Sequence, residues 1–468
     1  MGLLDENRLL PLEHSVLLVA QRLYLQVKNL PIISPHGHTD PRWYALNEAF
    51  ENPAQLFVTP DHYLFRMLHS QGIPLESLGV ARIDGGEIEQ DPRRIWTLFA
   101  QHYHLFRGTP SRLWIDHALR DVFDIHERLC GENCDAIYNL IAGCLQKDSF
   151  RPRALFKRFN IEVISTTESA LDELHWHRMI RDSGWQGRVI TTYRPDAVVD
   201  PEATDFVASV EQLGALTDED TRQWSGYLAA HRNRRAYFKS FGATASDHGH
   251  PSARTEDLPQ DEAAALFDKA MQGECTPLEA DVFRGQMLTE MAKMSLEDGL
   301  VLQIHAGSMR NHSAGIASRF GSDKGFDIPT RTDYVSGLKP LLNAVGHRAD
   351  LTVIVFTLDE TSYTRELAPL AGVYPALKMG PAWWFNDSFE GMKRFREMTT
   401  ETTGFYNTVG FNDDTRAFCS IPARHDVARR VDCGYLATLV ATGRLDEDEA
   451  GHLAYELAYG LAKKAYRL

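Results

Sequence analysis

The stretch PIISPHGH (residues 31–38) runs from a short apolar segment into two histidines that flank one glycine. A short apolar run bounded by prolines is typical of a buried strand. Residues two apart on a strand point to the same face, so His36 and His38 can share one metal ion. The stretch therefore predicts a buried strand that ends in a pair of metal ligands.

Spacing alone is a weak criterion, because three other His-x-His pairs occur in the chain. On a helix, residues two apart diverge by about 200° and cannot bind one ion. Two of the pairs lie in apolar patterns of helical spacing, whereas His248/His250 ends a run that resembles a strand. Backbone geometry therefore leaves His36/His38 and His248/His250 as candidates. The two helical pairs are His102/His104 and His175/His177.

The composition is that of an ordinary globular protein with a large core. The chain has 468 residues, 43% of them hydrophobic, and 49 basic against 64 acidic residues give a net charge of −15. No basic block stands out, which argues against nucleic acid as a partner. There is no signal or transmembrane pattern, and the six cysteines are scattered, as expected for reduced thiols. We expect a cytoplasmic protein that binds neither nucleic acid nor membrane.

Short apolar runs alternate with helical patterns along the chain. This order is typical of a parallel sheet with helical crossovers. Eight candidate strands predict an α/β fold, a closed (β/α)₈ TIM-type barrel, with a helical insertion after the first strand. The candidate strands are 31–38, 160–167, 187–196, 236–249, 300–308, 351–359, 373–382 and 406–416.

The chain is longer than the roughly 250 residues that such a barrel needs. The surplus lies mainly between the first and second strands, where the pattern is helical. We therefore predict an N-terminal helix in residues 1–30, a barrel in 31–44 and 151–468, and a helical insertion in 45–150 that covers the active-site rim.

The chemistry of such barrels is carried out at the C-terminal ends of the strands. Closure places the eighth strand beside the first, so a carboxylate from Asp413 or Asp414 joins the two histidines. Three protein ligands with an open position are typical of a catalytic metal. The strand ends carry His36, His38, Thr166, Thr167, Arg194, Asp247, His248, His305, Trp383, Trp384, Asp413, Asp414 and Arg416.

These motifs resemble the uronate isomerase (glucuronate isomerase) family of the amidohydrolase superfamily. The resemblance runs in order over most of the chain, and its motifs are specific only in combination. They are HGHTDP (36–41), DHYLFRML (61–68), STTES (165–169), YRPD (193–196), SDHG (246–249), HAGSMRN (305–311), WWFND (383–387), DTRAF (414–418) and ARHDVARR (423–430).

The resemblance implies interconversion of D-glucuronate with D-fructuronate and of D-galacturonate with D-tagaturonate. It also implies one divalent metal, expected to be Zn²⁺ with Mn²⁺, Ni²⁺ or Co²⁺ as alternatives. The ligands would be His36, His38 and Asp414, the aspartate being chosen because the family motif aligns on Asp-Ser/Thr-Arg. Gly37 and Asp413 depart from the family's usual residues and leave the ligand types intact.

A uronate is an anion, so an acidic chain needs local arginines to bind it. We expect proton transfer through a cis-enediol, with Asp414, Tyr63 and His36 as catalytic residues. On resemblance, Tyr63 handles the C2 proton, which requires positive charge such as Arg66 or the metal to depress its pKa. The expected substrate-binding residues are His62, Arg66, Arg194, His248, His305, Trp383, Arg416 and Arg424.

Two other functions stay open from the sequence. One is a metal-dependent hydrolase of the same superfamily. Hydrolases with two metals use a lysine of the fourth strand and a histidine of the sixth as ligands, but here the sixth strand has no histidine and Lys239 lies too early in the fourth strand. The other is a catalytically inactive barrel that binds sugar acids. For His305, coordination of the metal as a fourth ligand is the alternative to substrate contact. The substrate is expected to be a free hexuronate, and the chain to form a homo-oligomer.

Overall fold

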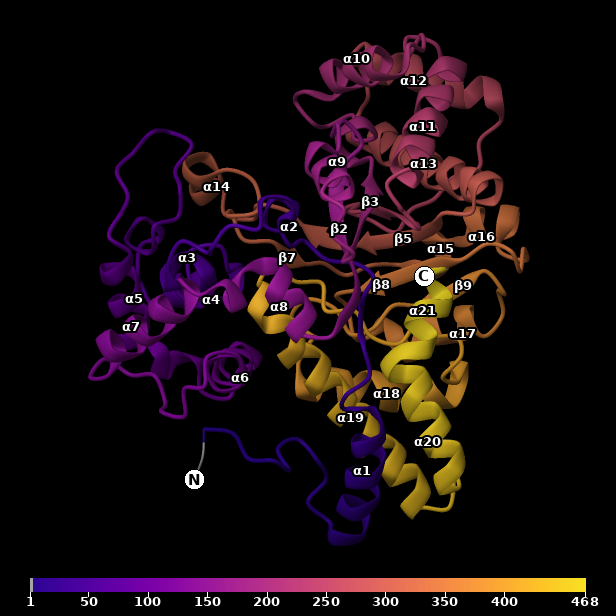
Figure 1. The fold of residues 1–468 in the computed structure, drawn as a ribbon. Coiled ribbons are helices and arrows are strands. Elements are labelled where there is room, and N and C mark those ends of the chain that lie inside the picture. Colours follow the sequence, from indigo (N-terminus) through magenta and orange to yellow (C-terminus); the bar gives the residue numbers. More distant parts are fainter. Residues whose placement is uncertain (1–2) are drawn as a thin grey trace.

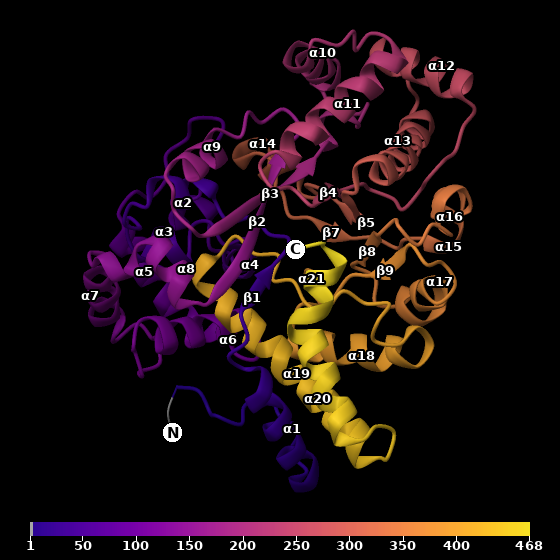
Figure 2. The ribbon, with the colours of Figure 1, turned by 45° about the vertical axis from the view of Figure 1, so that its right-hand side comes forward.

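A computed structural model describes residues 3–468. Seven parallel strands form one curled sheet, and the helices lie around it (Figures 1 and 2). Their order in the sheet is β1 (Ile32–Ser34), β2 (Ile161–Ser169), β3 (Arg188–Arg194), β4 (Ala245–His248), β5 (Val301–Ala306), β8 (Val353–Thr357) and β9 (Leu377–Met379). This is the α/β, TIM-type barrel that the sequence predicts.

The segment 406–416 occupies the place of the eighth strand without forming a regular one. On one side, the amide of Met379 donates to the carbonyl of Asn407 at 2.9 Å, and Thr408 makes a single parallel bridge to Met379. On the other side, the amide of His38 donates to the carbonyl of Thr415 at 3.1 Å. The segment therefore spans the gap between β9 and the residues that follow β1.

The predicted fourth strand, 236–249, is wrong in its first half. Helix α11 (Trp224–Lys239) continues through Phe238, and β4 begins only at Ala245. Buried side chains recur along α11 every three or four residues, and this helical period includes the aromatic residues that suggested a strand. Lys239 is the last residue of this helix and is not part of a strand.

The outer face of the sheet packs against helices. The largest apolar cluster joins β5 and β8 to α10 (Phe206–Thr217), α11, α12 (Gln260–Met271), α13 (Pro277–Asp298) and α16 (Lys339–Val345). In Figure 2, α10 to α13 lie together on one side of the strands. Helices α9 (His175–Asp182), α17 (Ala368–Ala371) and α18 (Phe389–Thr403) complete the crossovers.

Between β1 and β2 the chain is helical. After α2 (Pro41–Leu46) come α3 (Pro53–Phe57), α4 (His62–Ser70), α5 (Pro92–Gln101), α6 (Pro110–His117) and α7 (Cys134–Leu145), and α8 (Pro152–Arg158) leads into β2. These helices gather beside the barrel (Figure 1) around a second apolar cluster rich in aromatic residues. The domain boundaries at 44 and 150 stay a prediction.

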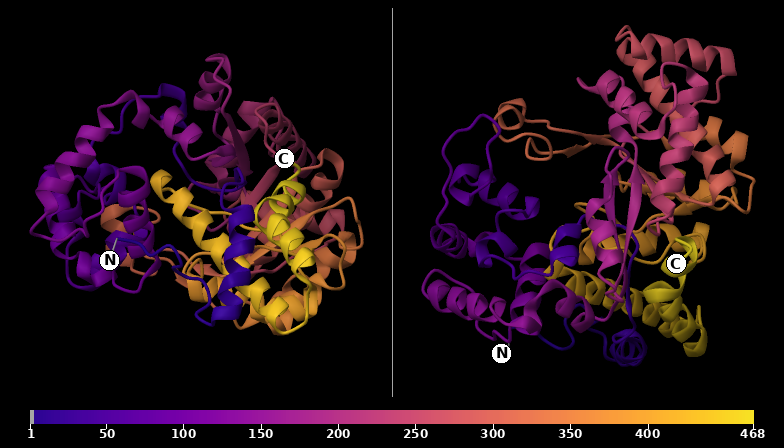
Figure 3. Two further views of the ribbon diagram at one scale, coloured as in Figure 1. Left: turned by 60° about the horizontal axis from the view of Figure 1, so that its bottom comes forward. Right: turned by 45° about the horizontal axis from the view of Figure 1, so that its top comes forward.

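Both ends of the described chain pack together. Helix α1 (His14–Val27) lies against α19 (Ile421–Ala441) and α20 (Glu447–Tyr455), and α21 (Leu461–Ala465) follows (Figure 3). The side chain of Glu13 caps α1 by accepting from the amides of Ser15 and Val16. Within residues 3–468, no helix is long and apolar enough to cross a membrane.

Candidate metal centre and active site

Three potential metal ligands converge where β1 ends beside the segment 406–416. Oδ1 of Asp414 lies 3.5 Å from Nε2 of His36 and 3.2 Å from Nε2 of His38. Burial alone would raise the pKa of Asp414, but the two imidazoles lower it below its ordinary value. Burial lowers the pKa of His36 to about 4. At neutral pH the site therefore offers a carboxylate and, at His36, an imidazole lone pair.

The structure separates the two adjacent aspartates. Asp414 has a positive φ of 39° and turns its carboxylate toward His36 and His38, while its Oδ2 accepts from Nε1 of Trp383 at 2.6 Å. Asp413 instead contacts helix α19, with its Oδ2 3.0 Å from Nε2 of His425. A non-glycine residue at positive φ costs free energy and is common at functional sites. The geometry therefore favours Asp414 as the metal ligand.

A second cluster of ligand atoms shares His36. Nδ1 of His305 lies 2.5 Å from Oδ1 of Asp247, and the His305 ring stacks on His36 with 4.8 Å between centroids. The contact with a carboxylate assigns the proton to Nδ1, so Nε2 carries a lone pair. That Nε2 is buried and has no partner among residues 3–468.

The residues present fit a divalent metal ion. The candidate ligand atoms of His36, His38 and Asp414 lie within 4.8 Å of one another, and those of His36, Asp247 and His305 do so as well. Imidazole and carboxylate ligands suit zinc and its first-row neighbours. His305 and Asp247 lie where they can complete or support the coordination of the first three residues.

The guanidinium of Arg194 faces the same interior but is already paired. Its Nε donates to Asp196 at 2.8 Å, and Nη1 lies 3.1 Å from Oδ2 of Asp247. Burial would lower its pKa, but the two carboxylates raise it above the ordinary value. Arg194 therefore holds Asp247, which in turn holds His305.

Tyr63 reaches the rim from helix α4. Its hydroxyl donates to Oδ1 of Asp387 at 2.8 Å, and Nη1 of Arg424 donates to Oδ2 of the same carboxylate at 2.6 Å. Burial raises the pKa of Tyr63 well above its ordinary value, and Asp387 raises it further. The expectation that Arg66 depresses this pKa is wrong, because burial and the carboxylate of Asp387 outweigh the lowering by the nearby cation Arg424. Tyr63 is a protonated phenol at neutral pH.

Comparisons with known proteins identify the family of the chain. The family model described as glucuronate isomerase matches residues 3–466. A uronate isomerase from Rhizobium meliloti (strain 1021) is 66% identical over 467 residues, with 100% of both chains covered. The crystal structure of glucuronate isomerase from Caulobacter crescentus superposes with a TM-score of 0.98 at 56% identity, covering 100% of this chain and 98% of that one.

The chain belongs to the glucuronate isomerase family.

Membership of the glucuronate isomerase family makes the chain an isomerase and removes the basis for the two other functions considered from the sequence. A putative metal-dependent hydrolase from Lactobacillus casei ATCC 334 has a TM-score of 0.53 at 15% identity, covering 95% of this chain and 97% of that one. At that identity the likeness shows the fold alone. The chain thus shares its architecture with a putative hydrolase, which is consistent with the predicted TIM-type barrel.

In this glucuronate isomerase family member, helix α4 docks on the loop that follows β9. The ring of His62 packs edge-to-face on Trp384 at 5.5 Å, and the guanidinium of Arg66 lies 4.6 Å from the centroid of Phe385. Arg66 makes no ion pair within residues 3–468, and burial lowers its pKa. Trp383 turns inward, 4.6 Å from the ring of His305.

The two remaining predicted arginines differ in their exposure. Arg416 is 38% exposed and pairs with Asp323 at 3.0 Å. Arg424 is 3% exposed, and its guanidinium lies 3.6 Å from the centroid of the Trp114 ring. Arg424 thus forms a buried ion pair with Asp387, whereas Arg416 retains a free face toward solvent.

The predicted substrate contact of His248 is not supported by its orientation. His248 and Ser246 share one face of β4, with Nε2 of His248 3.1 Å from Oγ of Ser246. Asp247 points to the opposite face, where it meets His305 and Arg194. Because side chains alternate along a strand, His248 faces the surrounding helices. His250 is buried beside it, with 6.0 Å between ring centroids.

Sequence reasoning missed three acidic positions. Asp247 was noted at a strand end but received no role, and Asp387 and Asp196 were quoted only within motifs. Each pairs with a residue that was predicted: His305, Tyr63 and Arg194 respectively. The positions of these aspartates in motifs at strand ends could have indicated a role. Their partners could not be predicted, because they are distant in sequence.

Proposed function

We propose that this isomerase interconverts D-glucuronate with D-fructuronate and D-galacturonate with D-tagaturonate, using one divalent metal ion. The observation that carries the proposal is the convergence of His36, His38 and Asp414 at one end of the barrel. We propose Zn²⁺ as the ion, with Mn²⁺, Ni²⁺ or Co²⁺ as alternatives, because the same ligand types accept all four.

The substrate carboxylate goes to the free cations of the rim. Arg66 has no ion pair among the described residues, and Arg416 has a single pair, to Asp323. Arg194 is engaged by Asp196 and Asp247, so a substrate would have to compete with two carboxylates. Arg66 and Arg416 therefore bind the anionic end, and Arg194 acts mainly by holding Asp247.

The metal, when bound, supplies Lewis acidity to the oxygens of the open-chain sugar. Asp414 is ionised and accepts a hydroxyl proton during ring opening. Two groups can take the C2 proton: the carboxylate of Asp414, or Nε2 of His305 when that nitrogen does not bind the metal, since it has no partner among residues 3–468. Tyr63 starts protonated, and its one O–H turns from Asp387 to the enediol oxygens when substrate is bound.

A coupled assay of metal-loaded protein with glucuronate and galacturonate tests the activity. In deuterated water, proton transfer should place deuterium on one face of C1 of the ketose, because one base serves one side of a fixed enediol. A C2-deuterated substrate, followed for crossover at low conversion, identifies a base that is shielded from water. Turnover of an ester, amide or lactone without isomerisation would contradict the proposal.

One variant can identify the base. His305→Gln retains a polar side chain but lacks a basic nitrogen, so we expect it to lose C2 proton exchange if His305 is the base. Retention of exchange in that variant would assign the step to Asp414. We also propose that the protein works in the cytoplasm as a homo-oligomer and binds neither nucleic acid nor membrane.

A further inference from the structure

A polar cavity lies at the opposite end of the barrel from the metal centre. It has a volume of about 400 Å³ and is bordered by Lys28 to Leu30, just before β1, by Ile32 at the start of β1, and by Phe159 and Asn160, just before β2. The metal centre is instead at the carboxyl ends of the strands. The volume of the cavity lies within the range of small-molecule sites, which is about 300–1,000 Å³.

The lining of this cavity is strongly basic, with six cationic side chains and two aspartates, Asp121 and Asp426. The local excess is therefore four positive charges, which is unusual in a chain with a net charge of −15. Burial lowers the pKa of His117, which also lines the cavity and adds no charge at neutral pH. The six cations are Arg8, Lys28, Arg120, Arg158, Arg429 and Arg430.

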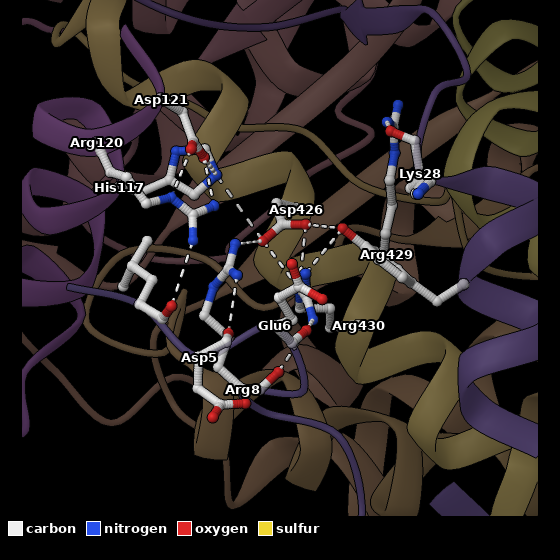
Figure 4. A network of polar contacts seen from close by, with 12 residues as sticks. Asp5, Glu6, Arg8, Lys28, His117, Arg120, Asp121, Asp426, Arg429 and Arg430 are labelled. Carbon is white, nitrogen blue, oxygen red and sulfur yellow. Dashed lines mark hydrogen bonds and ion pairs between the residues drawn. The ribbon is translucent and has the colours of Figure 1, made fainter. Parts of the chain in front are cut away.

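The two carboxylates are shared among half of these cations. Asp426 accepts from Arg8 at 2.5 Å and from Arg430 at 2.9 Å, while Asp121 accepts from Arg120 at 2.6 Å (Figure 4). Asp5 and Glu6 lie in the N-terminal segment beside this network but do not line the cavity. Three cations therefore lack a carboxylate partner within residues 3–468: Lys28, Arg158 and Arg429.

Two of the arginines that line the cavity, Arg429 and Arg8, have guanidinium N–H donors without a partner among the described residues. Arg429 is 6% exposed and donates to the carbonyls of Lys28, Leu30 and Pro31, but its Nε has no partner among the described residues. The Nε of Arg8 is likewise buried and unpartnered. Buried charged donors without an acceptor are costly, and a bound anion would satisfy them.

We infer that this cavity binds a small organic polyanion, a phosphate monoester or a di- or tricarboxylate. An excess of four positive charges matches a ligand with two or more negative charges better than a monoanion. Arg429 and Arg8 supply the inner donors, and the exposed Lys28 and Arg158 hold the outer part at the mouth. Phe159 and Val122 give the cavity an apolar wall for the carbon skeleton.

Helix α19 connects this cavity with the active site. Arg424 and His425 contact Asp387 and Asp413 on the side of the metal centre. Asp426, one residue later, anchors the second network. A ligand that shifts this helix would therefore affect the active site as well as the cavity. The rate of isomerisation is for that reason a second measurement of binding.

Calorimetric titration at constant ionic strength tests the inference without requiring isomerase activity. The probes are glucose 6-phosphate and citrate, which separate phosphate from carboxylate ligands, and glucose is the uncharged match of the first. We expect at least one anion to bind and glucose not to bind. In Lys28→Gln/Arg158→Gln the affinity should fall at least tenfold, because two charged donors are removed.

The matched control is Arg222→Gln/Lys393→Gln, which removes the same charge from exposed positions outside the cavity. Its affinity should equal that of the parent. The inference is overturned if neither anion binds, or if the Lys28/Arg158 variant binds as tightly as the parent. Isomerase rates measured with and without the bound anion test the route through α19, and unchanged rates would overturn that route alone.

Discussion

The indole N–H of Trp383 should control how tightly the metal centre holds its ion. It donates to Oδ2 of Asp414 at 2.6 Å, while Oδ1 of the same carboxylate faces His36 and His38. Trp383→Phe keeps an aromatic ring and deletes this donor. A hydrogen bond to a charged acceptor contributes about 1.5–3 kcal/mol, which corresponds to a factor of about 10–150. Loss of a partner that orients a metal ligand usually costs about 10–100-fold in metal affinity.

Trp384→Phe is the matched control, because the neighbouring indole N–H is buried without a partner in residues 3–468. Both changes remove the same atoms from adjacent residues. Competition for Zn²⁺ between the metal-free protein and a chromogenic chelator gives the dissociation constants. We expect Trp383→Phe to bind Zn²⁺ about 10–100-fold more weakly and Trp384→Phe to stay within about twofold of the parent. Equal affinities in the two variants would refute the role assigned to Trp383.

Four further changes test other parts of the structure. Burial raises the pKa of Glu168 from its ordinary value of 4.5 to about 8. The stability that the protonated side chain contributes is therefore fully present below pH 4.5 and is lost as the pH rises through about 8. Glu168→Gln should match the parent in urea unfolding at pH 4 and be more stable by about 2–5 kcal/mol at pH 9. Tyr63→Phe should lower kcat about 100-fold in the coupled assay, and a parental rate would exclude it as a donor. Arg66→Met should raise KM at least tenfold with an unchanged melting temperature, whereas Arg194→Met should also lower the melting temperature because Asp247 loses its cation.

The parts of the site that the sequence predicts are those that depend on chain direction alone. His36 and His38 follow an apolar run, and Asp414 lies in the last candidate strand, so barrel closure brings them together without knowledge of any side-chain contact. The same reasoning does not choose between Asp413 and Asp414. That choice depends on the positive φ of Asp414, a local distortion that no periodic pattern encodes.

The pKa of Tyr63 shows why electrostatic roles were harder to predict than positions. Its placement on the insertion suggested contact with Arg66, three residues along the same helix. The structure instead brings Asp387 to its hydroxyl across 324 positions of sequence. Burial raises the pKa of Tyr63, and the carboxylate at hydrogen-bond distance raises it further. The chemistry of a lid residue therefore depends on the loop against which it docks.

His248 and Asp247 show what alternation along a strand leaves open. Neighbouring residues of the fourth strand face opposite ways, but the sequence does not show which of the two faces inward, and the substrate contact was assigned to the histidine of the SDHG motif. Once β4 is limited to Ala245–His248, the pairing of Asp247 with His305 fixes Asp247 as inward. Alternation then places His248 outside the barrel. The inward face thus carries a carboxylate that orients a histidine, which is the arrangement a proton-transfer site needs, and the candidate base moves from Tyr63 to Nε2 of His305 or to Asp414.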